Sequence, residues 1–95
     1  MIGAPSSEGE RLAAVEAFAE ANSYLGSHQW INAEESFRKT VLLDGSVAKY
    51  HAGLASVLML LEKWKDAEAE YTVAVLLDLD NPVYRRLVKE ARSKR

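Results

Sequence analysis

The residue types that most often carry out chemistry in proteins are scarce in this chain. The sequence has 95 residues, no cysteine and only two histidines, His28 and His51. Without thiolates there is no disulfide, no zinc–cysteine site, no iron–sulfur cluster and no cysteine nucleophile. No phosphate-binding loop, HExxH or GxSxG motif occurs. We therefore expect no enzymatic activity, no catalytic residue, no cofactor and no metal site.

The histidines and the neighbouring carboxylates have structural interpretations instead. His28 falls in a turn between two expected helices, and His51 falls at a helix-packing position. We expect a capping or half-buried structural role for both. Adjacent carboxylates on a helix are usually solvated. Outward, exposed positions are therefore expected for Glu34, Glu35, Glu68 and Glu70.

The elements that must position these residues are helices of one small domain. The length suits a single domain, and a composition of 48% hydrophobic residues with five Gly and two Pro favours packed helices over disorder. Residues 1–7 lack the charged and apolar regions of a secretory signal. The densest apolar stretch, residues 52–61, is about half as long as a membrane span. We therefore expect a flexible tail at residues 1–7 and a cytoplasmic protein.

The chain repeats itself with an offset of 34 residues. At this offset nine positions are identical, where composition alone would give about two or three. The identities are Ala14 with Ala48, Ala21 with Ala55, Trp30 with Trp64, Ala33 with Ala67, Glu34 with Glu68, and residues 41–44 with residues 75–78. Each unit has two segments of helical apolar spacing joined by a few residues, which predicts two antiparallel helices. Because the tryptophans recur at one repeat position, we interpret them as packing residues.

Local signals mark where the expected helices begin and end. The first helix of each unit is expected at about residues 8–26 and 47–61, and the second begins at the tryptophan. A fifth helix is expected at about residues 82–93. Three pairs of residues have capping patterns, namely a capping box at Ser7 and Glu10, a helix stop and N-cap at Gly45 and Ser46, and an N-cap before proline at Asn81 and Pro82.

This 34-residue unit resembles the tetratricopeptide repeat (TPR). The residues that match the family motif are Ala17, Ala21, Tyr24, Ala33 and Phe37 in the first unit and His51, Leu54, Ala55, Leu58, Ala67 and Tyr71 in the second. Gly45 and Leu79 stand where the family usually has proline. The resemblance implies an all-α, TPR-like α-solenoid of two antiparallel helix pairs plus a fifth, capping helix. It implies a single domain at residues 8–95, with repeats at about 14–47 and 48–81 and the capping helix at about 82–93.

Solenoids of this family form a concave groove lined by the first helix of each repeat, so the resemblance implies a protein–protein interaction module. We expect a non-catalytic adaptor or co-chaperone-like scaffold whose groove binds a peptide or an amphipathic helix of another protein. The residues that the resemblance assigns to this partner-binding groove are Val15, Phe18, Asn22, Leu25, Lys49, Ser56, Met59 and Arg86.

One subset of the family grips the C-terminal carboxylate of heat-shock chaperones with a clamp of two asparagines and three basic residues. Asn22 matches the first clamp asparagine. The other four clamp positions hold no asparagine and no basic residue, being Phe18, Gly53, Val83 and Leu87. With one match in five, we do not expect that clamp in this chain.

The charge of the chain is divided between an acidic body and a basic end. Residues 1–81 contain six basic and thirteen acidic residues, whereas residues 82–95 contain six basic residues and one acidic residue. Cations late in a helix complement its dipole, and a contact with an acidic partner through Arg85, Lys89 and Arg92 is the alternative. We do not expect nucleic-acid or membrane binding, because this end lacks interleaved aromatic residues and follows an acidic body.

The sequence leaves alternatives to the peptide-binding module open. Two repeats plus a cap are fewer than the roughly three repeats that usually suffice for stability, which suggests a homo-oligomerising scaffold. Residues 48–55 and 77–82 are also similar to repeats of type III secretion chaperones, which hold an apolar segment of a client. TPR units fused to J-domains end in a similarly basic helix.

Overall fold

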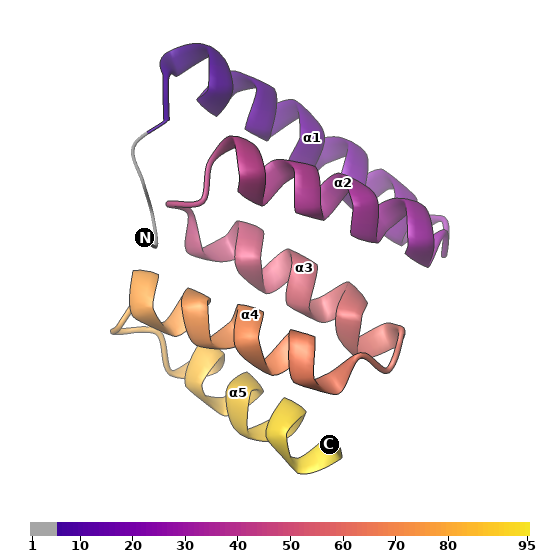
Figure 1. Ribbon diagram of the computed structural model, residues 1–95, viewed down its shortest axis with the longest axis vertical. Helices are drawn as coiled ribbons and strands as arrows, with labels where there is room; N and C mark the ends of the chain where they lie inside the picture. The colour runs from indigo at the N-terminus through magenta and orange to yellow at the C-terminus, as the bar shows by residue number, and fades with distance from the viewer. Residues whose placement is uncertain (1–5) are drawn as a thin grey trace.

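Five α-helices follow one another along the chain and lie side by side, as Figure 1 shows. The computed structural model describes residues 6–95. In this range the helices are α1 (Glu8–Gly26), α2 (Trp30–Leu43), α3 (Ala48–Leu60), α4 (Trp64–Leu77) and α5 (Pro82–Lys94), with no strand between them. Each helix packs on the next, and α1 and α5 lie at opposite ends of the stack (Figure 1). The all-α expectation is confirmed.

The helix boundaries lie close to those expected from the sequence. α1 has the expected bounds, α3 is one residue shorter at each end, and α5 ends at Lys94 rather than near Ser93. The short turns make α1 antiparallel to α2 and α3 antiparallel to α4. The tail expected at residues 1–7 falls, for residues 1–5, outside the described residues.

Two of the three predicted capping patterns are present. The Glu10 N–H donates to Ser7 Oγ at 3.1 Å, and the Ser7 N–H donates to Glu10 Oε1 at 3.0 Å. These two bonds complete a capping box and hold the pKa of Glu10 below its usual value. At the start of α5, the Val83 N–H donates to Asn81 Oδ1 at 2.9 Å. Both caps satisfy N–H groups that a helix start leaves without partners.

The N-cap predicted at Ser46 is wrong. The N-cap residue of α3 is Val47, which provides no side-chain hydrogen bond. Ser46 instead donates its hydroxyl to Asp44 Oδ1 at 2.6 Å and its N–H to the same oxygen at 3.1 Å. An aspartate side chain accepts readily from the residue two positions later, which closes a turn. The serine therefore belongs to the turn between the repeats and not to the helix.

The turns inside the two repeats have the same geometry, although neither has a glycine at its tightest position. His28 and Glu62 occupy the same repeat position and have positive φ angles of 61° and 59°. The next residue in each turn donates its N–H to a carbonyl five residues earlier, from Gln29 to Tyr24 at 2.9 Å and from Lys63 to Leu58 at 2.8 Å. This Schellman arrangement satisfies carbonyls at the helix end. His28 lies in this turn as expected, but it is exposed rather than half-buried.

Small residues let the helices approach one another closely at the centre of the stack. The fully buried alanines include two pairs that are equivalent in the two repeats: Ala21 with Ala55, and Ala33 with Ala67. A Cβ atom added to Gly53 would lie only 2.6 Å from Phe37 Cε1. Because Phe37 itself is fully buried, a side chain at this position of α3 would push α3 away from α2.

The exposed position expected for Glu34 is wrong. Glu34 is only 9% exposed, and its carboxylate accepts from Lys63 Nζ and from Arg38, each at 2.9 Å. Burial opposes ionisation, but the hydrogen bonds from the two cations outweigh it and hold the pKa of Glu34 below its usual value. The carboxylate therefore ties α2 to the turn between α3 and α4.

Glu68, at the equivalent position of the second repeat, is paired as well, and it is partly exposed rather than fully exposed as expected. Its carboxylate accepts from Arg92 at 2.7 Å and from Arg95 at 2.5 Å. These two guanidinium groups hold the pKa of Glu68 below its usual value. The repeated glutamate thus joins α4 to α5, as Glu34 joins α2 to the turn that follows α3.

His51 contacts two acceptors. One of them, Glu70, is partly exposed rather than fully exposed as expected. His51 Nδ1 lies 2.8 Å from Glu70 Oε1, and Nε2 lies 3.0 Å from the Gly45 carbonyl oxygen. Burial disfavours the charged ring, but hydrogen bonds to the two acceptors favour it and raise the pKa of His51. The ring is half-buried, as expected, and joins α3 to α4. Of the four glutamates, Glu35 alone is exposed.

Candidate partner-binding groove

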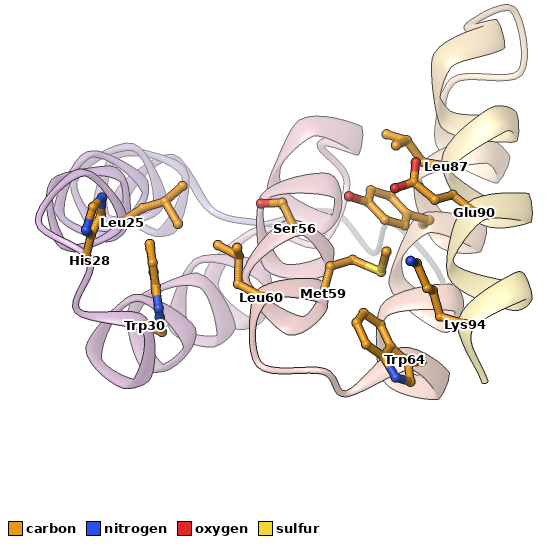
Figure 2. A pocket seen from close by; sticks show the side chains of 11 residues that line it. Leu25, His28, Trp30, Ser56, Met59, Leu60, Trp64, Leu87, Glu90 and Lys94 are labelled. Atoms are coloured by element: carbon orange, nitrogen blue, oxygen red, sulfur yellow. The ribbon is translucent and has the colours of Figure 1, made fainter.

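An open hollow crosses one face of the stack, from α1 past α3 to α5 (Figure 2). Its volume is about 530 Å³. All five helices and one turn contribute side chains to this groove hollow, and most of the side chains are apolar or aromatic. They are Leu25, His28, Trp30, Ser56, Met59, Leu60, Trp64, Tyr71, Leu87, Glu90 and Lys94.

Helical spacing brings the central residues of the groove hollow together. α3 contributes positions i, i+3 and i+4, which are Ser56, Met59 and Leu60. α5 contributes positions i, i+3 and i+7, which are Leu87, Glu90 and Lys94. Residues at these spacings lie on one face of a helix, so each helix presents one stripe to the hollow.

Trp30 and Trp64 line the groove hollow at the same position of the two repeats. Figure 2 shows their indoles on either side of Leu60. Trp30 also packs on the core, as the sequence indicated, and its ring centroid lies 5.0 Å from that of His28. Sequence reasoning did not assign either tryptophan to the groove. The sequence feature that could have indicated their place in the groove is that a tryptophan recurs immediately after the turn in both repeats.

The eight residues predicted to face a partner do not all reach the groove hollow. Three of them line it, namely Leu25, Ser56 and Met59. Phe18 is half-buried and packs on two aromatic rings of the core, with centroid distances of 5.9 Å to Phe37 and 4.8 Å to Tyr50. The other four are exposed and lie outside the lining, namely Val15, Asn22, Lys49 and Arg86.

Lys49 belongs with Phe18 rather than with the lining of the groove hollow. Its Nζ atom lies 5.9 Å from the centroid of the Phe18 ring, a cation–π distance. This contact leaves the ammonium group on the surface, where it is exposed. The site therefore has an apolar centre, with single cations beside it.

The three cations predicted to contact an acidic partner line a different surface. Arg85, Lys89 and Arg92 surround a smaller hollow between α4 and α5. Arg85 donates to the Leu79 carbonyl oxygen, and Arg92 is the residue that pairs with Glu68. The groove hollow and this second hollow have no residue in common.

The described residues contain neither a cluster of metal ligands nor a membrane-spanning helix. Among residues 6–95, no three His, Asp or Glu side chains lie close enough together to hold a metal ion. No helix in this range is long and apolar enough to cross a membrane. The groove hollow has an apolar surface that can contact an apolar side chain of a ligand, and the charged groups of Glu90 and Lys94 lie next to this surface.

No protein-family model matches the sequence, and no curated protein gives a significant match. Solved structures do match. The Arabidopsis OM64 TPR domain superposes with a TM-score of 0.84 at 24% identity, over 90% of this chain and 70% of that one. The second TPR domain of human RPAP3, in complex with the HSP70 peptide SGPTIEEVD, gives a TM-score of 0.84 at 22% identity, over 90% and 71% of the two chains.

A third similar structure is the first TPR of Spaghetti (RPAP3), bound to the HSP90 peptide SRMEEVD. It gives a TM-score of 0.79 at 19% identity, over 84% of this chain and 64% of that one. The helix order, the 34-residue repeat and the superpositions agree with one another. The chain therefore has the fold of a tetratricopeptide-repeat domain.

Proposed function

We propose that this chain is a non-catalytic interaction module whose groove hollow binds a peptide or an amphipathic helix of another protein. The proposed role is that of an adaptor or co-chaperone-like scaffold. The observation that carries the proposal is the apolar lining, which combines side chains from three helices: Leu25, Met59, Leu60 and Leu87. An open apolar concavity favours a ligand that buries apolar side chains in it. Two domains of the same fold bind short peptides, which supports a peptide as the ligand.

A ligand longer than the groove hollow would reach the exposed predicted residues beside it. Asn22 and Lys49 precede the lining residues on α1 and α3, and Arg86 lies next to Leu87 on α5. We include these three residues in the proposed surface as polar contacts. They provide donors for the backbone carbonyls or carboxylates of a ligand.

The proposed ligand differs from the chaperone peptides bound by the similar domains. Both of those peptides end in EEVD, with a C-terminal carboxylate. In this chain, Gly53 lies against Phe37, and Leu87 provides apolar surface where the carboxylate clamp would need a donor. A free carboxylate near these positions would lose water without gaining a hydrogen bond, which is unfavourable. Apolar anchors are therefore the proposed basis of recognition.

Peptide selection from a random library displayed on phage, with the whole chain as bait, tests this function. Selected peptides are expected to have apolar residues at a spacing of three or four. Leu60→Glu places a charge in the apolar contact and is expected to weaken binding by more than about tenfold. The Kd of labelled selected peptides, measured by fluorescence polarisation, gives the size of the change.

Leu42→Glu is the matched control, because Leu42 is 84% exposed on α2 and lies outside the groove hollow. This variant is expected to keep the affinity of the unchanged protein. Peptides that bind Leu60→Glu and the unchanged protein equally well would contradict the groove assignment. SGPTIEEVD and SRMEEVD serve as second probes and are expected to bind more weakly than the selected peptides. Tight binding that depends on their free carboxylate would indicate a clamp instead.

A further inference from the structure

A second hollow, of about 250 Å³, lies between α4 and α5 on a surface that the proposed function does not use. Two half-buried valines, Val75 and Val88, form its apolar part. Three exposed cations surround them: Arg85, Lys89 and Arg92. We call this surface the basic hollow. An apolar side chain flanked by carboxylates is the ligand that it fits.

The repeat explains why the basic hollow is open. The α5 residues Arg85, Val88, Lys89 and Arg92 are equivalent to the α3 residues His51, Leu54, Ala55 and Leu58. On α3, which packs on α4, His51 bonds to Glu70 of α4, and the last three residues are at most 1% exposed. Within residues 6–95, no helix covers the equivalent face of α5. In the part of the chain that the structure describes, the basic hollow is therefore an unfilled helix-binding position of the fold.

The opposite end of the stack carries the complementary pattern. Leu12 on α1 is 60% exposed. Glu8 and Glu16 stand four residues before and after it, on the same face of the helix, and both are exposed. α1 as a whole contains four glutamates and one arginine. An exposed leucine between two carboxylates is what the basic hollow requires.

The dimensions of the two surfaces also agree. Glu8 and Glu16 are about 12 Å apart along the axis of α1, and Arg85 and Arg92 are about 10.5 Å apart along α5. Each guanidinium group uses one N–H in the bonds described above and keeps others for a second carboxylate. Among the described residues, Lys89 has no salt bridge.

The two surfaces lie at opposite ends of one molecule, so they do not meet within a chain (Figure 1). We infer that α1 of a second copy docks in the basic hollow, with its Leu12 on Val75 and Val88 and its glutamates beside the cations. Such a head-to-tail contact uses different surfaces on the two copies. It leaves one α1 and one basic hollow free at the ends, so further copies add in the same way.

Sedimentation velocity on the full chain tests this association. At low salt, we expect the average mass to rise above the 10.6 kDa of one chain as the concentration increases from about 10 μM to about 1 mM, and to exceed that of two chains. At about 1 M salt, where the Debye length is about 3 Å, the increase should disappear. A mass of one chain at every concentration and salt level would overturn the inference.

Two variants distinguish a head-to-tail contact from a symmetric one. Leu12→Ala removes the apolar contact but leaves the basic hollow intact, and Lys89→Glu damages the basic hollow but leaves α1 intact. Each variant alone is expected to associate at least about tenfold more weakly than the unchanged protein. An equimolar mixture should form pairs of chains and nothing larger, because one intact contact remains. A mixture as weakly associated as either variant alone would overturn the head-to-tail geometry.

Leu42→Ala is the matched control, since it shortens an exposed leucine outside both surfaces. It is expected to leave the association unchanged, and a loss as large as that of Leu12→Ala would contradict the assignment to α1. Leu12 and Lys89 lie outside the groove hollow, so both test variants should keep the affinity for selected peptides. Association and peptide binding therefore succeed or fail separately.

Discussion

α3 and α5 occupy equivalent positions of the repeat, and they differ in how much of each helix is covered. α3 packs between α2 and α4, whereas the main packing partner of α5 among the described residues is α4. The thirteen residues of α3 include one Lys and no other charged residue except His51, while the thirteen of α5 include six charged residues. The comparison shows that the burial of a helix face depends on which helices pack against it. A face that a neighbour covers has apolar or small residues, and an uncovered face has charged residues.

Single positions make this difference concrete. Where α3 has the fully buried Ala55, α5 has the exposed Lys89. Where α3 has Gly53 against Phe37, α5 has Leu87, which lines the groove hollow. These two covered positions, where helices come close, tolerate only a small side chain, while an uncovered position tolerates a long charged chain that keeps its end in water.

The largest expected effect comes from exchanging residues between the covered and uncovered faces. Ala55→Lys forces a cation into the core between α3 and its neighbours and is expected to destabilise the protein by about 4 kcal/mol or more. The reverse change, Lys89→Ala on α5, is expected to alter the free energy of unfolding by less than about 0.5 kcal/mol. Urea denaturation followed by circular dichroism measures both. Similar effects of the two changes would contradict the contrast between the helices.

A smaller effect is expected at Gly53. Alanine normally stabilises a helix interior relative to glycine, but here its Cβ would lie 2.6 Å from the ring of Phe37. Gly53→Ala is therefore expected to destabilise the fold by about 1–3 kcal/mol. Gly9→Ala on α1 is the matched control, because nothing lies within 4 Å of the added atom, and it is expected to be neutral or stabilising. The same urea titrations decide between these outcomes, and a stabilised Gly53→Ala protein would show that α2 and α3 are not in close contact there.

The smallest effect concerns pH, because α3 has His51 where α5 has an arginine that stays charged. The pKa of His51 is raised in the folded protein by its bonds to Glu70 and Gly45. Its contribution to stability is thus fully present below the unfolded pKa of about 6.5 and is lost as the pH rises through the folded pKa. The melting temperature is expected to fall over that interval. His51→Gln should remove this part of the pH dependence, and equal slopes for the two proteins would contradict it.

Much of the fold could be predicted from the sequence, because the relevant signals are local or repeated. The capping box at Ser7 and the start of α5 at Asn81 follow from local patterns, and the buried alanines follow from the 34-residue repeat. A serine between two helices can cap the second helix or bond within the turn. Ser46 was assigned to the cap, but its hydroxyl donates to Asp44 and so belongs to the turn.

The candidate site was harder to predict, because it depends on contacts between repeats. Glu34 and Glu68 were identified as repeated residues. Of the cations that pair with them only Arg38 is local, whereas Lys63, Arg92 and Arg95 come from distant positions with no repeat of their own. The partners Lys63 and Arg92 meet these carboxylates only after the helices stack. Trp30 packs on the core as expected, yet the exposure of Trp30 and Trp64 to the groove hollow depends on how α1, α3 and α5 are spaced.

The two tryptophans of the groove hollow have a spectroscopic consequence. They are the only tryptophans in the chain, and each repeat contributes one of them to the lining. Both are half-buried, so a bound ligand would change the hydration of the indoles and with it their emission. A Trp64→Phe protein emits from the first repeat alone, and a Trp30→Phe protein emits from the second. The pair therefore provides two built-in optical reporters that record, without any label, which part of the groove a ligand occupies.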